Sequence, residues 1–212
     1  MGLLLGSCAM YIANVGIVVR VLYNMPVAKP YKPSSLDAAQ FRRVVSIHVA
    51  AIGTANAAVR LPVGLLSDYL VRVHRLDRCW LLLVTAGWLA CAHLLASSVQ
   101  NPLALVAVSA MEGIGRGSTS TLGPSIVSAF WGSRQLSRNW VLMLWGITVG
   151  TMVLNSTFGI IFDEYTNRLG GCIGSQCYGD VFVISAVACA LATLVIAMRL
   201  KYPRRRITES FA

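Results

Sequence analysis

Six long apolar stretches separated by polar links run along the chain. They lie at residues 3–24, 44–68, 79–97, 102–129, 139–162 and 180–199. Each is about as long as a helix needs to be to cross the hydrocarbon core of a bilayer, roughly 20 residues. The stretches are too long for barrel strands and lack their alternation of apolar and polar residues. The pattern predicts an all-α membrane protein, a single domain over 1–212 with six transmembrane helices.

The links and the basic residues predict how these helices are oriented. Short links at 98–101 and 132–138 make neighbouring helices antiparallel, so both termini lie on one side of the bilayer. Ten basic residues accumulate on that side, against six on the other. The ten are Arg72, Arg75, Arg78, Arg134, Arg138, Arg199, Lys201, Arg204, Arg205 and Arg206. The positive-inside rule therefore predicts a multi-pass protein with both termini in the cytoplasm.

Composition supports a membrane protein and excludes several other classes. Hydrophobic residues make up 56% of the chain and charged residues 12%, with a mean hydropathy of +0.67. That apolar content is too high for a water-soluble or disordered chain of 212 residues. The net charge of +10 comes mostly from residues that flank the apolar runs, so it forms no basic domain for nucleic acid. The partner that composition predicts is the lipid bilayer.

Polar side chains inside the spans rank the helices by predicted exposure. They occur in the first, second, fourth and fifth spans: Tyr11, Asn14, Asn56, Arg60, Glu112, Arg116 and Asn155. Such groups belong in a bundle interior or a water-filled cavity, so we expect them to line a substrate or proton pathway. The third and sixth spans carry few polar groups and are expected to face lipid. This pattern is typical of two inverted three-helix repeats, a common transporter design.

Glu112 and Arg116 are the most informative pair. They lie four residues apart on one helical face, and Glu112 is about 15 Å from the start of its span, near the midplane. One hypothesis is that Arg116 holds a substrate anion and Glu112 carries a coupled proton. The alternative is a structural ion pair that sets helix register. The alternating glycines Gly113, Gly115 and Gly117, with Pro124 beyond them, predict that this helix bends or opens toward a cavity.

The end of the second span carries a family resemblance. The stretch at 60–75 resembles the signature loop of the major facilitator superfamily, in which a helix end with Gly and Asp leads into a short basic loop. Gly64 would allow a close helix approach, and Asp68 would pair with a cation to latch one conformation. Here Tyr69 replaces the usual basic residue after Asp68. Arg72 and Arg75 are therefore the candidate partners.

Further segments resemble the nodulin-like and fungal monocarboxylate-transporter-homologue branch of that superfamily. They are Tyr-Ile-Ala-Asn-Val-Gly at 11–16, Pro-Ser-Ile-Val-Ser at 124–128, Trp-Gly at 131–132, Asn-Trp at 139–140, and Cys-Ile-Gly-Ser-Gln-Cys-Tyr at 172–178. The resemblance implies the carboxy-terminal half of a twelve-helix fold. It also implies alternating-access transport of a small solute, with symport as one mode, and favours the vacuolar membrane over the plasma membrane. An organic anion such as a monocarboxylate would suit Arg116.

The remaining chemistry-bearing residues indicate neither an enzyme nor a cofactor. Cys172 and Cys177 share a loop on the non-cytoplasmic side and are expected to form a disulfide, with free thiols as the alternative. The histidines do not cluster with other metal ligands, so no metal site is predicted. One half cannot enclose a two-sided pathway, so we expect an amino-terminal half or a second copy as partner. The rival hypothesis is a non-transporting partner or regulatory subunit, or a truncated gene product.

Overall fold

The computed structural model describes residues 1–23, 35–169 and 174–201, and within these ranges the chain forms helices and the segments that join them. The six α-helices are α1 (Gly2–Leu22), α2 (Ser35–His74), α3 (Cys79–Ser98), α4 (Pro102–Trp131), α5 (Leu136–Leu169) and α6 (Gly179–Lys201). Short 3₁₀ turns at Ser133–Gln135 and Ser175–Cys177 precede α5 and α6. The all-α prediction is confirmed, and each apolar stretch falls in one helix, except that Tyr23 follows the end of α1 and Asn24 lies outside the described residues.

Five of these helices are long and apolar enough to cross a membrane by length and composition: α1, α2, α3, α5 and α6. The sixth, α4, has 30 residues but contains Glu112, Arg116 and many Gly and Ser residues, so its crossing stays a prediction. α2 and α5 have 40 and 34 residues. At 1.5 Å per residue they are about 60 and 51 Å long, well beyond the ~30 Å hydrocarbon core.

Local sequence sets the ends of α4 clearly. Its first turn is capped by Asn101, whose side chain accepts a hydrogen bond from the Leu103 amide at 2.9 Å, and Pro102 occupies the first helical position. At the other end Gly132 has a φ of 78°, which favours glycine, and the helix stops there. Between these ends α4 is one continuous helix that includes Pro124.

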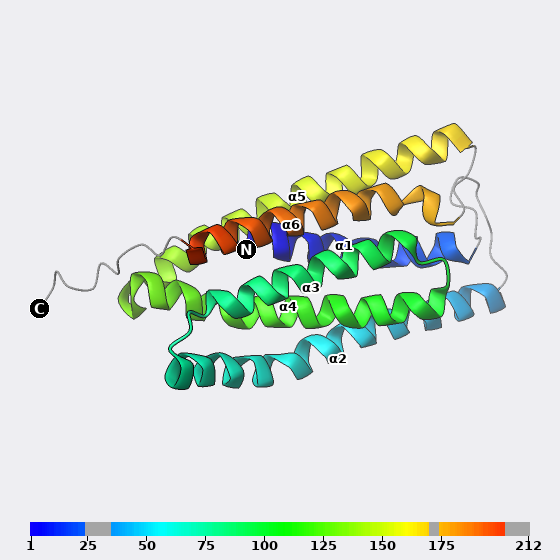
Figure 1. Cartoon of the computed structure of the whole chain (residues 1–212). Helices are drawn as coiled ribbons and strands as arrows, with labels where there is room; N and C mark the ends of the chain where they lie inside the picture. Colours follow the sequence, from blue (N-terminus) through cyan, green and yellow to red (C-terminus); the bar gives the residue numbers. More distant parts are fainter. Residues whose placement is uncertain (24–34, 170–173, 202–212) are drawn as a thin grey trace, which may run out of the picture.

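Neighbouring helices run in opposite directions (Figure 1). The start of α1, the end of α6 and the α2–α3 and α4–α5 links all lie toward one end of the bundle. The basic residues of these links, such as Arg78 and Arg134, therefore share that end. This arrangement agrees with the antiparallel order expected from the short links, while the side of the membrane stays a prediction.

The helices pack most extensively in three pairs: α2 with α4, α3 with α6, and α1 with α5. Glycines bring two of these pairs into backbone contact. On α1, an added Cβ at Gly2 would lie 2.5 Å from the carbonyl oxygen of Gly146 on α5. An added Cβ at Gly6 would lie 2.7 Å from the carbonyl carbon of Gly150. Small residues four apart on both helices let the two backbones touch, as in membrane helix dimers.

Atoms of the neighbouring helices α2 and α3 occupy the space beside three glycines of α4. A Cβ added at Gly113 or Gly117 would lie 2.5 Å from a backbone oxygen of α2, and one added at Gly115 would lie 2.2 Å from Leu89 of α3. The prediction that these glycines open α4 toward a cavity is therefore wrong. They allow close packing on two opposite faces of one continuous helix.

Burial within the single chain does not follow the predicted order of helix exposure, and which helices face lipid stays a prediction. The apolar windows of α3 and α6 are 44% and 33% buried, whereas those of α2 and α5 are only 6% and 11% buried. α3 and α6 pack along each other and cover the centre of the bundle. α2 and α5 each contact the bundle along one narrow side and leave their outer faces without a neighbour in the single chain.

Candidate functional site

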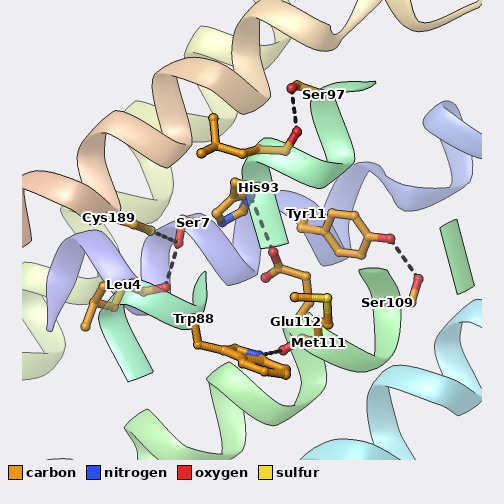
Figure 2. Close-up of polar contacts among 11 residues, drawn as sticks. Leu4, Ser7, Tyr11, Trp88, His93, Ser97, Ser109, Met111, Glu112 and Cys189 are labelled. Atoms are coloured by element: carbon orange, nitrogen blue, oxygen red, sulfur yellow. Dashed lines mark hydrogen bonds and ion pairs between the residues drawn. The ribbon is translucent and has the colours of Figure 1, made fainter. Parts of the chain in front are cut away.

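Glu112 lies at the centre of the bundle and is completely buried. Its Oε1 is 3.4 Å from Nδ1 of His93 on α3, whose side chain is also completely buried. Figure 2 shows the imidazole and the carboxylate directed toward each other across the α3–α4 contact. Neither carboxylate oxygen and neither ring nitrogen forms a hydrogen bond of ordinary geometry. The two groups lie close together in an apolar interior, and their hydrogen-bonding capacity is not satisfied.

Arg116 is not the partner of Glu112. Although the two residues share a face of α4, the described residues contain no ion pair between them, and the Arg116 side chain is only partly buried. The alternative of a Glu112–Arg116 ion pair is therefore wrong. The i, i+4 spacing predicted the shared face correctly, but burial separates the two groups because the carboxylate points into the bundle beside α3.

Side chains of α1 and α6 complete the surroundings of the carboxylate. Cys8 of α1 is buried within electrostatic range of Glu112. One residue earlier, the Ser7 hydroxyl lies 3.3 Å from the Cys189 sulfur of α6 and donates to the Leu4 carbonyl at 2.8 Å. Figure 2 shows the Ser7 hydroxyl between the Leu4 carbonyl and the Cys189 sulfur, and Ser7, Cys8 and Cys189 are all buried. The carboxylate thus lies where α1, α3, α4 and α6 meet.

A second polar contact lies one turn earlier on α4. The Ser109 hydroxyl is 2.7 Å from the Tyr11 hydroxyl of α1 and 2.8 Å from Nδ1 of His48 on α2. All three residues are buried, and Nε2 of His48 has no hydrogen-bond partner among the described residues. Tyr11 was predicted as a pathway residue, but Ser109 and His48 were missed. The available signal was the spacing of Ser109 three residues before Glu112, which places both on one side of α4.

Two further predicted residues meet across the α1–α5 contact. The Asn14 side chain donates to the Asn155 side-chain oxygen at 2.9 Å and to the Met10 carbonyl at 2.8 Å. In an apolar environment a hydrogen bond between two side-chain amides links the helices that carry them and helps to fix their register. The structure therefore brings Asn14 and Asn155 together from 141 residues apart.

Asn56 and Arg60 lie away from this centre. Arg60 is exposed on the outer side of α2, and its guanidinium donates only a long hydrogen bond of 3.4 Å to Asn56. Asn56 itself is partly buried where α2 passes Gly117. In the single chain neither side chain lies with Glu112 and His93, so their predicted place on a pathway depends on what covers α2.

The proposed latch at the end of α2 has a different cation from the predicted ones. Asp68 pairs with Arg78, the residue that precedes α3, at 2.8 Å, and Arg78 also donates to the Ser67 hydroxyl at 3.3 Å. Arg72 and Arg75 are exposed, and Arg75 has a φ of 53° in the turn between the helices. This turn brings Arg78 back toward the end of α2, which no spacing in the sequence revealed.

Gly64 does not have the packing role expected of it. A Cβ added there would meet only the Thr121 methyl group at 3.6 Å, an ordinary van der Waals contact. The close approach of α2 and α4 depends on glycines of α4 instead. Gly64 therefore matches the family signature, but the packing in this structure does not require a glycine at that position.

The cysteines and potential metal ligands add no second centre. Cys172 lies outside the described residues, so the predicted disulfide with the buried Cys177 stays a prediction. Cys8, Cys79 and Cys189 are buried in helices, and Cys91 is exposed. Within residues 1–23, 35–169 and 174–201, no three His, Cys, Asp or Glu side chains converge as metal ligands would.

A family model described as "NFD4, C-terminal domain" matches residues 41–209, which include most of α2 and all of α3 to α6. The chain belongs to this family. The family resemblance seen in the sequence is thereby confirmed, including the match to the carboxy-terminal part of longer proteins and to the fungal monocarboxylate-transporter homologues. The matched range contains Glu112, His93 and Asp68.

Similar proteins in fungi carry transporter names. The chain is 27% identical over 181 residues to "Probable transporter MCH1" of Wickerhamomyces anomalus, covering 84% of this chain and 33% of that protein. It is 30% identical over 161 residues to the protein of the same name in Yarrowia lipolytica, covering 71% and 33%. An "Uncharacterized membrane protein" of Saccharomyces cerevisiae is 25% identical over 227 residues, covering 99% and 40%. The chain thus spans about a third of the length of the first two curated relatives.

Proposed function

We propose that this chain forms the carboxy-terminal half of a major facilitator superfamily transporter that moves a small solute by alternating access. The transporter names of similar fungal proteins support this proposal. The observation that carries it is the buried polar centre around Glu112. An acidic side chain in a membrane helix costs at least ~2.5 kcal/mol, so a stability role alone would favour an apolar residue there.

The helix pairs support two three-helix repeats, α1 to α3 and α4 to α6. If the repeats are exchanged, α1 becomes α4 and α5 becomes α2, so the α1–α5 pair is converted into the α4–α2 pair. The α3–α6 pair is converted into itself. Exchanging the repeats therefore gives back the same three most extensive helix pairs. Glycines make backbone contact in both exchanged pairs, as expected for inverted repeats.

Within this fold, Arg116 would hold an anionic solute and Glu112 would carry the coupled proton. Arg116 has no carboxylate partner among the described residues, and its side chain is partly exposed. A guanidinium in this condition suits bidentate binding of a carboxylate, which favours an organic anion such as a monocarboxylate. Glu112, one turn away and fully buried, would gain and lose its proton as access alternates.

The outer faces of α2 and α5 would cover the pathway by packing against an amino-terminal half or a second copy. These faces expose large apolar side chains, among them Leu61 and Leu65 on α2 and Trp145 and Ile160 on α5, each more than 60% exposed. We place the assembly in the vacuolar membrane with the Arg78 and Arg134 end in the cytoplasm, consistent with the positive-inside rule.

Flux through the purified chain in liposomes tests the proposal. The probe is radiolabelled lactate, with acetate and pyruvate as competitors, under an imposed inward proton gradient. We expect saturable uptake above that of empty liposomes, which Arg116→Ala abolishes and Arg134→Ala, in the exposed α4–α5 link, leaves unchanged. A Trp145→Cys variant in a Cys91→Ser background, crosslinked in the membrane, reports whether two copies meet through α5.

The outcomes separate the two classes of function. Saturable, Arg116-dependent uptake supports transport by this chain. No uptake from a folded chain whose α5 faces crosslink would overturn that role and favour a non-transporting partner subunit. Uptake that survives Arg116→Ala would refute the assignment of the anion to Arg116.

A further inference from the structure

The transport scheme above uses Glu112 but gives no role to its contact with His93. The nearest atoms, Nδ1 and Oε1, are 3.4 Å apart, both side chains are completely inaccessible, and none of their four polar atoms has a hydrogen bond. Buried polar groups in proteins are normally satisfied, so four open positions at one point of contact need a chemical explanation.

We propose that His93 and Glu112 share a single proton and together form the proton-binding site of the proposed transporter. This inference rests on the proposed function, in which Glu112 carries the coupled proton. With one proton between them the pair has no net charge, whichever group holds it. With two protons or none, the pair leaves a net charge inside an apolar bundle, at a cost of several kcal/mol.

The position of His93 is fixed from the α6 side. Its ring stacks on Phe182 with a centroid separation of 6.0 Å and an interplanar angle of 21°. Phe182 in turn packs against Tyr11 of α1, at 5.8 Å between centroids, and against Tyr178 at 5.5 Å. The imidazole is therefore held by the α3–α6 pair, while the carboxylate belongs to α4. Any shift of α4 against α3 changes the distance between the two groups.

Other titratable groups around Glu112 do not replace His93 as the second proton-binding group. Cys8 and Tyr11 of α1 and Cys189 of α6 lie within electrostatic range of the carboxylate, and all three are thiols or phenols that are neutral when protonated. Arg116 on α4 is permanently charged and does not exchange a proton. From α2, His48 bonds Ser109 rather than Glu112. No titratable group of α5 among the described residues interacts with Glu112.

This pairing changes what Arg116 has to do. Because His93 supplies the counter-charge when the carboxylate is ionised, the charge of Arg116 remains available to an anionic solute. The proton then binds to the His93–Glu112 pair, and the anion binds to the neighbouring but separate Arg116 of α4. They are coupled through movement of α4 rather than through a shared ion pair.

Infrared titration of the purified chain in detergent, without solute or partner, tests the proton-sharing pair. The parent should show a carboxylic acid C=O band that titrates with pH and is missing in Glu112→Gln. His93→Gln should move the midpoint of this band by one pH unit or more. His74→Gln, which changes an exposed histidine at the end of α2, should move it by less than about 0.3 unit.

A second measurement needs no substitution at His93 and guards against misfolding of that variant. Nuclear magnetic resonance of ¹⁵N-histidine-labelled protein should show one buried histidine whose titration changes in Glu112→Gln. If the infrared midpoint is the same in His93→Gln and the parent, or if no histidine responds to Glu112→Gln, the pair is not a shared proton site. These two measurements do not depend on flux. If both give the expected results in a chain that moves no solute, only the proposed function is overturned.

Discussion

Replacing Gly113 with alanine places a methyl group where α4 already touches the backbone of α2. The new Cβ would lie 2.5 Å from the Ile52 carbonyl oxygen and 2.9 Å from the Ala55 Cβ. Ordinary contacts begin near 3.4 Å, so the α2 backbone must retreat by about 0.9 Å at this point. A backbone oxygen cannot rotate aside as a side chain can, and the strain must be taken up by the whole helix pair.

The magnitude follows from two opposing effects. Overpacking of a tight contact costs about 1–3 kcal/mol, and alanine recovers up to about 1 kcal/mol of helix propensity relative to glycine. Gly113→Ala should therefore lower the free energy of unfolding by about 0–2 kcal/mol. The matched control is Gly87→Ala on α3, where an added Cβ meets nothing within 4 Å and only the propensity gain applies. The two variants should differ by about 1–3 kcal/mol.

Thermal unfolding in detergent, followed by the fluorescence of the five tryptophans, measures this difference. For a chain of this size each kcal/mol corresponds to about 2–4 °C in the midpoint. We expect Gly87→Ala to melt at or above the parent temperature and Gly113→Ala to melt clearly below Gly87→Ala. Equal midpoints for the two variants would show that α2 and α4 do not touch at Gly113, and the described helix pairing would be wrong.

Three other expectations follow from the contacts. Asn14→Ala and Asn155→Ala should each destabilise the chain, and the double variant should cost about 0.6 kcal/mol less than their sum; strict additivity would mean that the two amides do not meet. Asp68→Asn should slow solute exchange while changing the free energy of unfolding by less than about 1 kcal/mol, because the Asp68 side chain is half exposed. Loss of membrane expression would instead make Asp68 a folding residue. Ser133→Cys should react with an impermeant maleimide added from the cytosolic side of sealed vesicles, and protection there would reverse the orientation.

The helices themselves follow from the apolar runs, because a stretch of about 20 apolar residues has few alternatives to a buried or membrane-spanning helix. Helical spacing also placed Glu112 and Arg116 on one face of α4. Spacing along one helix does not identify the helix that packs against that face, so the pairing of Glu112 with His93 was missed. For the same reason the alternating glycines were interpreted as a bend, although they contact two different neighbours.

The latch and the order of exposure could not be predicted for related physical reasons. Arg78 reaches Asp68 only because the chain turns back at Arg75 with a positive φ, a local conformation that the residue type does not dictate. Polar residues in the second and fifth spans suggested interior helices. Exposure in a single chain, however, depends on how many neighbours a helix has, and α2 and α5 lie at the margins of the bundle.

The three helix pairs also set an order for the synthesis of this chain. Each pair joins one helix from α1 to α3 with one from α4 to α6. The first three helices therefore leave the ribosome before any of their main partners exist. α4 arrives first and joins α2, then α5 joins α1, and α6 finally joins α3. Until α5 arrives, Asn14 and the glycine face of α1 must be shielded by lipid or by the insertion machinery. A ribosome pause after α3 would therefore prolong the most vulnerable stage of this protein's assembly.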